Sequence, residues 1–160
     1  MMRFAALLPA LLLSLGATAS EITYEDRQAV LDLISAHSWG LDTYDTPLLV
    51  SLFTVDAVSK RYMAGELVAE AQTPAERSAD YDGREVFKNQ GIQTRHYTSN
   101  VLMEMVERGD IHVRSMTSVT YQYPDERAPR LVHTGRYELT ATKTESGWKF
   151  SRLELHFDHN

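Results

Sequence analysis

Two side chains in this sequence, those of Asp42 and His96, could carry out acid–base chemistry together. Asp42 lies in the segment Trp-Gly-Leu-Asp-Thr-Tyr-Asp, residues 39–45, and His96 lies in Arg-His-Tyr-Thr-Ser-Asn, residues 95–100. A neutral imidazole accepts a proton near neutral pH, and a carboxylate on its other nitrogen fixes the tautomer and stabilises the imidazolium. If the fold brings the two together in a pocket, they form a general-base pair that contributes roughly 10²–10⁴ in rate.

Each of these residues also has a purely structural interpretation. Asp42 could end the first helix, and His96 could be a strand-end histidine bonded to a backbone carbonyl. Asp45 is interpreted as a helix cap rather than as the catalytic carboxylate. No metal site is predicted, because the polar residues near the C terminus are expected to fray: His156, Asp158 and His159.

Composition and motifs exclude several other chemistries. The chain has no cysteine, which excludes thiol nucleophiles, thiolate metal sites and iron–sulfur clusters. It also has no Gly-rich phosphate loop, no His-Glu-x-x-His helix and no Gly-x-Ser-x-Gly elbow.

The first residues have the pattern of a secretory signal peptide. Arg3 precedes an apolar run over residues 4–15, and Ala17-Thr18-Ala19 is a small-x-small cleavage signal. The alternative is a membrane anchor, but the run is shorter than the roughly 20 residues that span a bilayer. We expect cleavage after Ala19 and a periplasmic or secreted protein, with residues 20–160 forming one domain.

The charge of the predicted mature chain limits its partners. Without Arg3 it has 15 basic and 22 acidic residues, a net charge of −7. This excess of acid argues against nucleic acid or an anionic membrane as the main partner.

The first half of the chain has helical patterns. Residues 24–40 carry apolar side chains at helical spacing after a capping signal at Thr23. A second helix is predicted to begin at 45–47, where Thr46 can cap and Pro47 suits the first turn. A third, short helix is predicted to begin at residues 82–85 and to carry Val86 and Phe87 inward. Residues 57–63 are a strand candidate, and 65–81 are expected to be a loop or lid with a possible helical turn at 67–71.

From residue 95 the apolar period changes toward two. Four long strands are predicted at 96–106, 111–123, 130–144 and 148–157, separated by short turn segments. Short links between strands produce an antiparallel meander. Helices followed by such a sheet define an α+β domain with the helices on one face of the sheet.

This layout resembles the SnoaL-like branch of the nuclear-transport-factor-2-like superfamily over almost the whole mature chain. The matching segments are 22–24, 41–42, 52–58, 95–100 and 147–150. The resemblance implies a cone-shaped domain in which N-terminal helices pack on a curved, mostly antiparallel sheet and enclose a pocket. Among its members, the sequence is most similar to scytalone dehydratase and hexachlorocyclohexane dehydrochlorinase, lyases that use an Asp–His pair without a cofactor.

The resemblance also implies roles for particular residues. Asp42 and His96 match the family's catalytic aspartate and histidine. Tyr62 lies close to a dehydratase tyrosine, and Arg152 lies near a pocket arginine of the dehydrochlorinase. His37 and Trp39 could line the same cavity. The dehydratase's second histidine is replaced by Arg114 or Ser115, which argues against a scytalone-like substrate.

The predicted function is therefore an exported lyase or isomerase, of dehydratase or dehydrochlorinase type, that acts on a small, largely apolar molecule. His96 would remove a carbon-bound proton while water or halide leaves the neighbouring carbon, and the leaving group would need a hydrogen bond or a positive charge. The alternative is a non-catalytic ligand-binding or assembly module of the same fold. Members of the family often form dimers or trimers, so we expect a homo-oligomer.

Overall fold

The computed structural model describes residues 21–158, apart from the side chain of Glu107, and the predicted signal peptide lies outside these residues. The helices are α1 (Tyr24–Thr43), α2 (Thr46–Ser51), α3 (Pro74–Asp82), α4 (Glu85–Asn89) and the short 3-10 helix η1 (Glu107–Gly109). The strands are β1 (Phe53–Met63), β2 (Glu66–Ala71), β3 (Gln93–Met105), β4 (Ile111–Gln122), β5 (Arg130–Thr144) and β6 (Gly147–Phe157).

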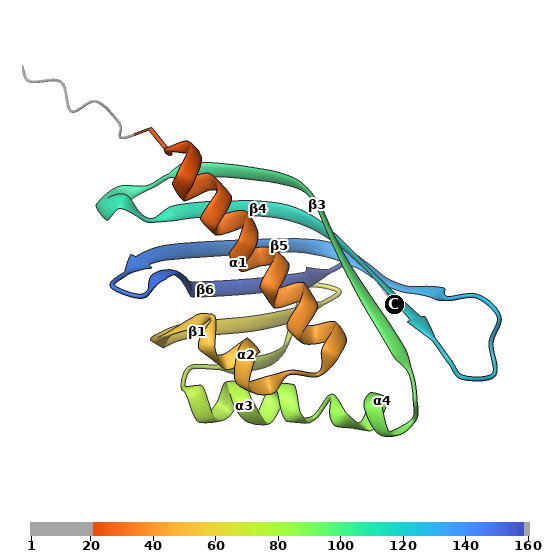
Figure 1. Ribbon diagram of the computed structural model, residues 1–160. Helices are drawn as coiled ribbons and strands as arrows, with labels where there is room; N and C mark the ends of the chain where they lie inside the picture. Colours follow the sequence, from red (N-terminus) through yellow and green to blue (C-terminus); the bar gives the residue numbers. More distant parts are fainter. Residues whose placement is uncertain (1–20, 159–160) are drawn as a thin grey trace, which may run out of the picture.

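The six strands form one curved sheet in the order β2-β1-β6-β5-β4-β3. Neighbours are antiparallel except β1 and β6, which run parallel. The predicted α+β architecture and the predicted meander of the last four strands are therefore confirmed. Figure 1 shows α1, α2 and α3 on one side of this sheet.

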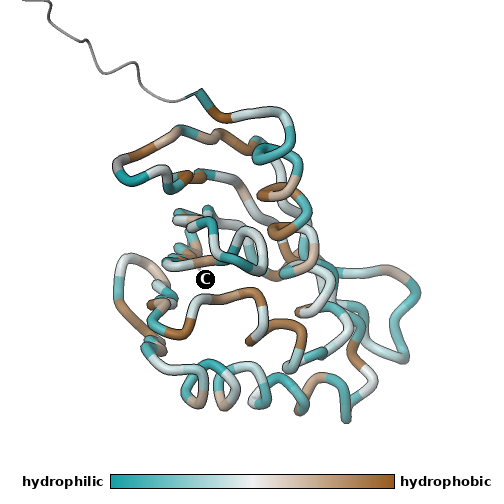
Figure 2. The backbone as a smooth tube through the Cα atoms, turned by 60° about the vertical axis from the view of Figure 1, so that its left-hand side comes forward, coloured by the Kyte–Doolittle hydropathy of each residue, from teal (hydrophilic) through white to brown (hydrophobic). Residues whose placement is uncertain are grey.

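The core lies between α1 and the covered face of the sheet. Its buried side chains come from α1, β1 and the three central strands, and include Val30, Ile34, Phe53, Val113, Leu139 and Phe150. Hydrophobic and hydrophilic residues alternate along the strands, while α3 is mostly hydrophilic (Figure 2). None of the helices in the described part of the chain has the length and apolar character needed to cross a membrane.

Residues 65–81, expected to be a loop or lid, instead contain strand β2 and helix α3. Ala64 and Gly65 both have positive φ, 50° and 85°, which suits the two-residue connection between β1 and β2. Helix α3 begins with a capping box, in which Thr73 accepts from the Glu76 backbone and Glu76 accepts from that of Thr73. The capping-box signal Thr-Pro-x-Glu is present at residues 73–76. The polar composition of the surrounding segment nevertheless favoured a loop over a helix.

Other helix boundaries also need correction. Helix α1 continues to Thr43, so Asp42 lies within its last turn. Asp45 caps α2 as expected, accepting from the Leu48 N–H, and Thr46 is the first helical residue rather than the cap. Val86 is exposed, whereas Phe87 packs against Tyr121; one turn of helix is too short to turn both side chains inward.

Candidate active site

Asp42 and His96 meet between the end of α1 and the beginning of β3. Asp42 Oδ1 lies 2.6 Å from His96 Nδ1, and Asp42 Oδ2 accepts a 3.0 Å hydrogen bond from the His96 backbone N–H. The Thr94 hydroxyl donates a third hydrogen bond to Oδ1, at 3.1 Å. The side chains of His96 and Asp42 are only 7% and 13% exposed. The Asp42 carboxylate and the His96 ring are therefore both held in place by the surrounding residues.

This geometry determines which nitrogen of His96 can act as a base. A carboxylate only accepts hydrogen bonds, so Nδ1 carries the hydrogen and Nε2 of the neutral ring has a free lone pair. Burial lowers the pKa of His96, the hydrogen bond to Asp42 opposes this effect, and the positive charge of Arg84 lowers the pKa further. The imidazole is accordingly neutral and able to accept a proton at neutral pH.

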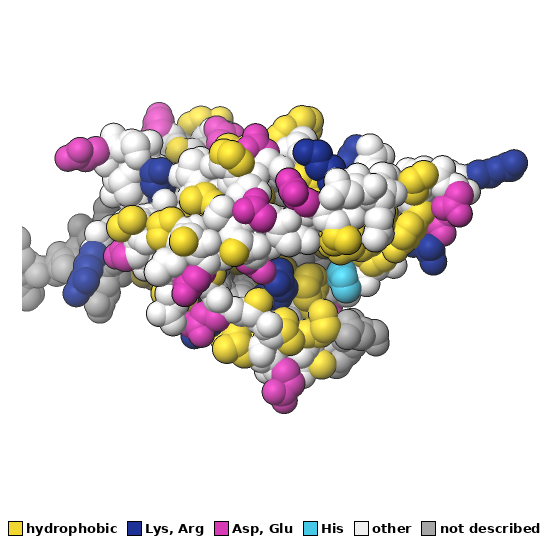
Figure 3. Space-filling model, turned by 90° about the horizontal axis from the view of Figure 1, so that it is seen from below, with side chains coloured by type: hydrophobic (Ala, Val, Ile, Leu, Met, Phe, Trp, Pro, Cys, Tyr) yellow, Lys and Arg dark blue, Asp and Glu magenta, His cyan; other side chains and the backbone are white. Residues whose placement is uncertain are grey.

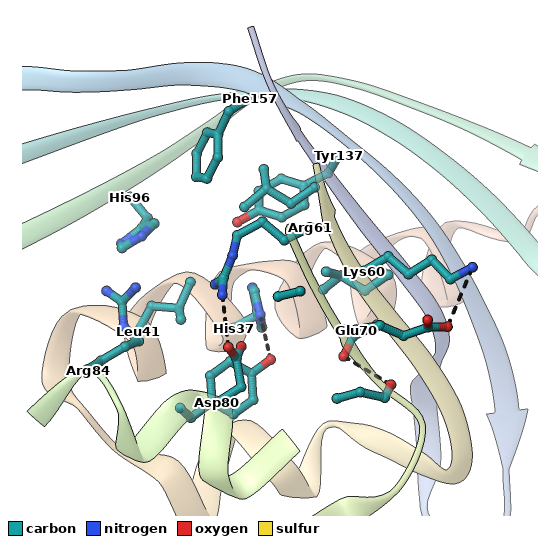
Figure 4. A pocket seen from close by; sticks show the side chains of 16 residues that line it. His37, Leu41, Lys60, Arg61, Glu70, Asp80, Arg84, His96, Tyr137 and Phe157 are labelled. Carbon is teal, nitrogen blue, oxygen red and sulfur yellow. Dashed lines mark hydrogen bonds and ion pairs between the residues drawn. The ribbon is translucent and has the colours of Figure 1, made fainter. Parts of the chain in front are cut away.

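His96 lies on the wall of a cavity between the helices and the covered sheet face. The cavity has an empty volume of about 620 Å³, including the part open to solvent. Apolar side chains from α1, β5 and β6 form much of its lining, among them Leu41, Tyr137, Leu153, Leu155 and Phe157. Figure 4 shows His96, Arg84 and Tyr137 around this space.

Two charged pairs lie on the same cavity wall. Arg61 binds Asp80 at 2.8 Å, and Lys60 lies 3.6 Å from Glu70. Both pairs are partly exposed, and within each pair the two opposite charges neutralise each other near solvent. Viewed from the α3–α4 side, the surface is notched between two lobes, with basic and histidine side chains along the notch (Figure 3).

His37, predicted to line the cavity, does so from the middle of α1. Its Nε2 lies 3.3 Å from the hydroxyl of Tyr81 on α3, and its ring meets Phe53, Tyr137 and Phe150 edge to face or nearly so. Burial lowers the pKa of His37 to about 3 and raises that of Tyr81. Both groups therefore stay neutral, and His37 is a packed, polar part of the cavity wall.

Trp39 lies on a different surface of α1. It is 69% exposed and borders a groove between α1 and β3, which Asp42 and His96 also line. His96 thus separates this groove from the inner cavity. Trp39 does not line the inner cavity, because two positions along a helix from His37 correspond to a rotation of about 200°.

Tyr62 and Arg152 are both placed on the opposite face of the sheet. Tyr62 stacks on His156 with ring centroids 4.5 Å apart, and its neighbour Arg61 faces the cavity instead. Arg152 is exposed and pairs with Glu154. Strict alternation along β6 would place Arg152 on the same face as Phe150, but the β5–β6 register shifts between Thr140 and Ala141 and places an extra residue between the two.

Arg84 is the cavity residue that the sequence interpretation missed. It precedes α4, and its guanidinium is directed toward the His96 imidazole in Figure 4. Its Nε and Nη2 atoms are buried without a hydrogen-bond partner in the described part of the protein. The Asp-Gly-Arg-Glu signal at 82–85 predicted a helix start, but periodicity does not show that the arginine turns inward.

Tyr137 is a second missed residue. It is buried on β5, and its hydroxyl is directed into the cavity in Figure 4. Burial raises its pKa to about 12, so the hydroxyl keeps its proton and can donate a hydrogen bond. Tyr137 and Leu139 are two positions apart on a strand and both are buried, so the alternation of β5 could have indicated that Tyr137 points inward.

The helices and the curved sheet that they cover define the cystatin-like, nuclear-transport-factor-2-like class of α+β proteins. The chain belongs to the SnoaL-like domain family, whose model matches residues 23–154. Comparison with curated proteins gives no match.

Solved structures agree with this assignment. ActVI-ORFA from Streptomyces coelicolor superposes with a TM-score of 0.74 at 20% identity, covering 84% of this chain and 98% of that one. A candidate scytalone dehydratase from Novosphingobium aromaticivorans gives 0.69 at 25% identity, covering 83% and 84%. A candidate aromatic ring hydroxylase from the same organism gives 0.69 at 27% identity, covering 86% and 92%.

Proposed function

We propose that this protein is an exported lyase or isomerase that removes a carbon-bound proton from a small, largely apolar molecule. The observation that carries the proposal is the 2.6 Å contact between Asp42 Oδ1 and His96 Nδ1 on the cavity wall. The similarity to a candidate scytalone dehydratase supports the same class of reaction.

The proposed elimination uses His96 as the general base. Nε2 of the neutral ring takes the proton, and the electron pair of the broken C–H bond forms the new C=C bond. The bond to the leaving group breaks with its electron pair, so hydroxide, protonated to water, or halide departs. Asp42 stabilises the imidazolium until it returns the proton to solvent or to the leaving group. In an isomerisation the proton would return to another carbon.

The lining of the cavity supplies a further reason for the proposal. Tyr137 can donate a hydrogen bond to a substrate oxygen without losing its own proton. The apolar side chains around it favour a substrate with a hydrocarbon skeleton. Arg61 and Asp80 are already paired, so neither is assigned a chemical role here.

The test uses a panel of cyclic β-hydroxy ketones, β-halo ketones and chlorinated cyclohexanes in D₂O, followed by ¹H NMR. We expect deuterium exchange at one carbon or release of water or halide, lost in His96→Ala and His96→Gln at unchanged circular dichroism. His112→Gln, which alters a partly exposed histidine outside the cavity, is the matched control. Unchanged turnover in both His96 variants would sink the proposal.

A wild-type protein that binds panel compounds without exchanging or eliminating anything would instead indicate a ligand-binding module. Export and self-association belong to the proposal and are tested separately. Mass spectrometry of protein recovered from outside the cytoplasm is expected to give an N terminus at Ser20. Light scattering of the purified protein is expected to give the mass of a dimer or trimer.

A further inference from the structure

Arg84 is a cationic group of the cavity that has no counter-ion. Arg61 pairs with Asp80 and Lys60 with Glu70, whereas the guanidinium of Arg84 forms no hydrogen bond or ion pair with any described residue. Asp42 does not compensate it directly, because its carboxylate is occupied by His96 and Thr94. The cavity therefore contains one uncompensated positive charge beside the proposed base.

Keeping this charge unpaired has a cost. A charged group removed from water without a partner destabilises the folded state, so buried guanidinium groups are normally paired. The effect of Arg84 extends to its neighbours, since its positive charge contributes to lowering the pKa of both His96 and His37. A ligand that brings a negative charge to Arg84 would remove this cost.

The shape of the free group narrows the choice of ligand. Nε–H and Nη2–H leave a guanidinium from one edge, in a fork that matches the two oxygens of a carboxylate. The same residue borders a second, adjoining space, whose lining includes the aromatic side chains of Phe87, Tyr121 and Phe157 beside polar and charged ones. A carboxylate attached to a ring or hydrocarbon skeleton fits both features.

We infer that Arg84 binds a carboxylate of the substrate and thereby places the substrate's carbon skeleton against Nε2 of His96. The inference deepens the proposed function and rests on it for the role of His96, but carboxylate binding itself requires no turnover. The cavity arginine therefore comes from the residue before α4, whereas Arg152 on the last strand lies on the opposite face of the sheet.

Binding is measured by isothermal titration calorimetry with four carboxylates, acetate, benzoate, cyclohexanecarboxylate and 2-naphthoate, and with their neutral amides. Wild-type protein is expected to prefer each ring carboxylate over its amide by tenfold or more. Arg84→Gln should lose that preference while keeping amide affinity, and Arg84→Lys should retain part of it. Arg152→Gln, an arginine on the opposite sheet face, is the matched control and should behave as wild type.

Two further measurements distinguish carboxylate binding from simple anion binding and from catalysis by His96. Sodium chloride and sodium sulfate at matched ionic strength test for a simple anion site, and competition as strong as that of benzoate would overturn the carboxylate assignment. His96→Gln should keep carboxylate binding, so loss of turnover in that variant would not bear on Arg84.

Thermal unfolding separates a binding role from a structural one. Without ligand, Arg84→Gln should melt at the same or a higher temperature than wild type, because the variant no longer holds an unpaired, half-buried charge. The inference is overturned if wild type shows no preference for carboxylates, if Arg84→Gln keeps that preference, or if Arg84→Gln melts well below wild type.

Discussion

Asp42 holds His96 at two points, through the imidazole Nδ1 at 2.6 Å and through the backbone N–H at 3.0 Å. The ring and the strand that carries it are therefore positioned by the same carboxylate. Such a double contact restrains both the tautomer and the direction of the free Nε2 atom.

Asp42→Asn should therefore reduce proton abstraction by roughly 10²–10⁴ while leaving the protein folded. An amide can present its NH₂ group to Nδ1, which favours the tautomer with the hydrogen on Nε2 and removes the basic lone pair from the cavity. ¹⁵N NMR of the His96 ring would detect the change without a substrate. A ring that keeps its hydrogen on Nδ1 in the variant, with undiminished turnover, would contradict the prediction.

Stability should decrease in acid because of His37. Its pKa falls from the ordinary 6.5 to about 3 on folding, so the unfolded chain binds the proton first as the pH drops. The free energy of unfolding is thus at its full value above pH 6.5 and falls between 6.5 and about 3, by up to about 1.4 kcal/mol per pH unit. Urea unfolding at pH 7.5, 5.5 and 4.5 measures this slope.

His37→Phe keeps an aromatic ring against Phe53 and Phe150 and has no titrating group. It should show a shallower dependence on pH, with the remainder coming from other groups whose pKa is lowered on folding, among them the buried His96 and the partly buried His133. His112→Gln serves as the control because His112 lies outside the cavity. Identical slopes for wild type and His37→Phe would rule out this role.

Arg77 should be among the most sensitive positions in the wall of the cavity. It is 1% exposed, donates to the carbonyls of Ala57 and Thr54 at 2.6 and 3.1 Å, and lies over the Phe53 ring. Arg77→Met leaves these carbonyls without donors and should lower the free energy of unfolding by roughly 2–4 kcal/mol.

The measurement for Arg77 is urea unfolding at pH 7.5, with Arg114→Met as a control at an exposed arginine. Because Arg77 is the buried residue that fastens α3 to β1, ligand binding should weaken as well. A loss no larger than that of Arg114→Met would show that α3 is held by other contacts.

Gly135 marks a close approach of two strands. A Cβ at this position would lie 2.2 Å from the carbonyl oxygen of His156 and 3.0 Å from the Phe157 Cα, both backbone atoms. Gly135→Ala should therefore lower the free energy of unfolding by roughly 1–3 kcal/mol or more, because β5 and β6 must move apart. Thermal unfolding compared with Arg136→Ala, at an exposed neighbour, would test this, and equal melting temperatures would contradict it.

Features that depend on local pattern could be predicted from the amino-acid sequence. Helical spacing after Thr23, the turn at Asp45 and the period of two from residue 95 predicted α1, α2 and the meander, because capping and alternation act over a few residues. Resemblance to the family singled out Asp42 and His96 before their contact was known. Polar residues 65–81 hid β2 and α3, since their burial depends on partners far along the chain.

Which side chains share the cavity with His96 depends on packing between distant parts of the chain. A single extra residue in β6 turns Arg152 to the opposite face from Phe150, and the same alternation along β1 turns Tyr62 away while Arg61 faces inward. Arg84 and Tyr137 enter the cavity through the placement of α4 and the curvature of β5. Local pattern fixes where a strand or helix forms, but a bulge or a helix position, set by packing across the whole sheet, fixes where a side chain points.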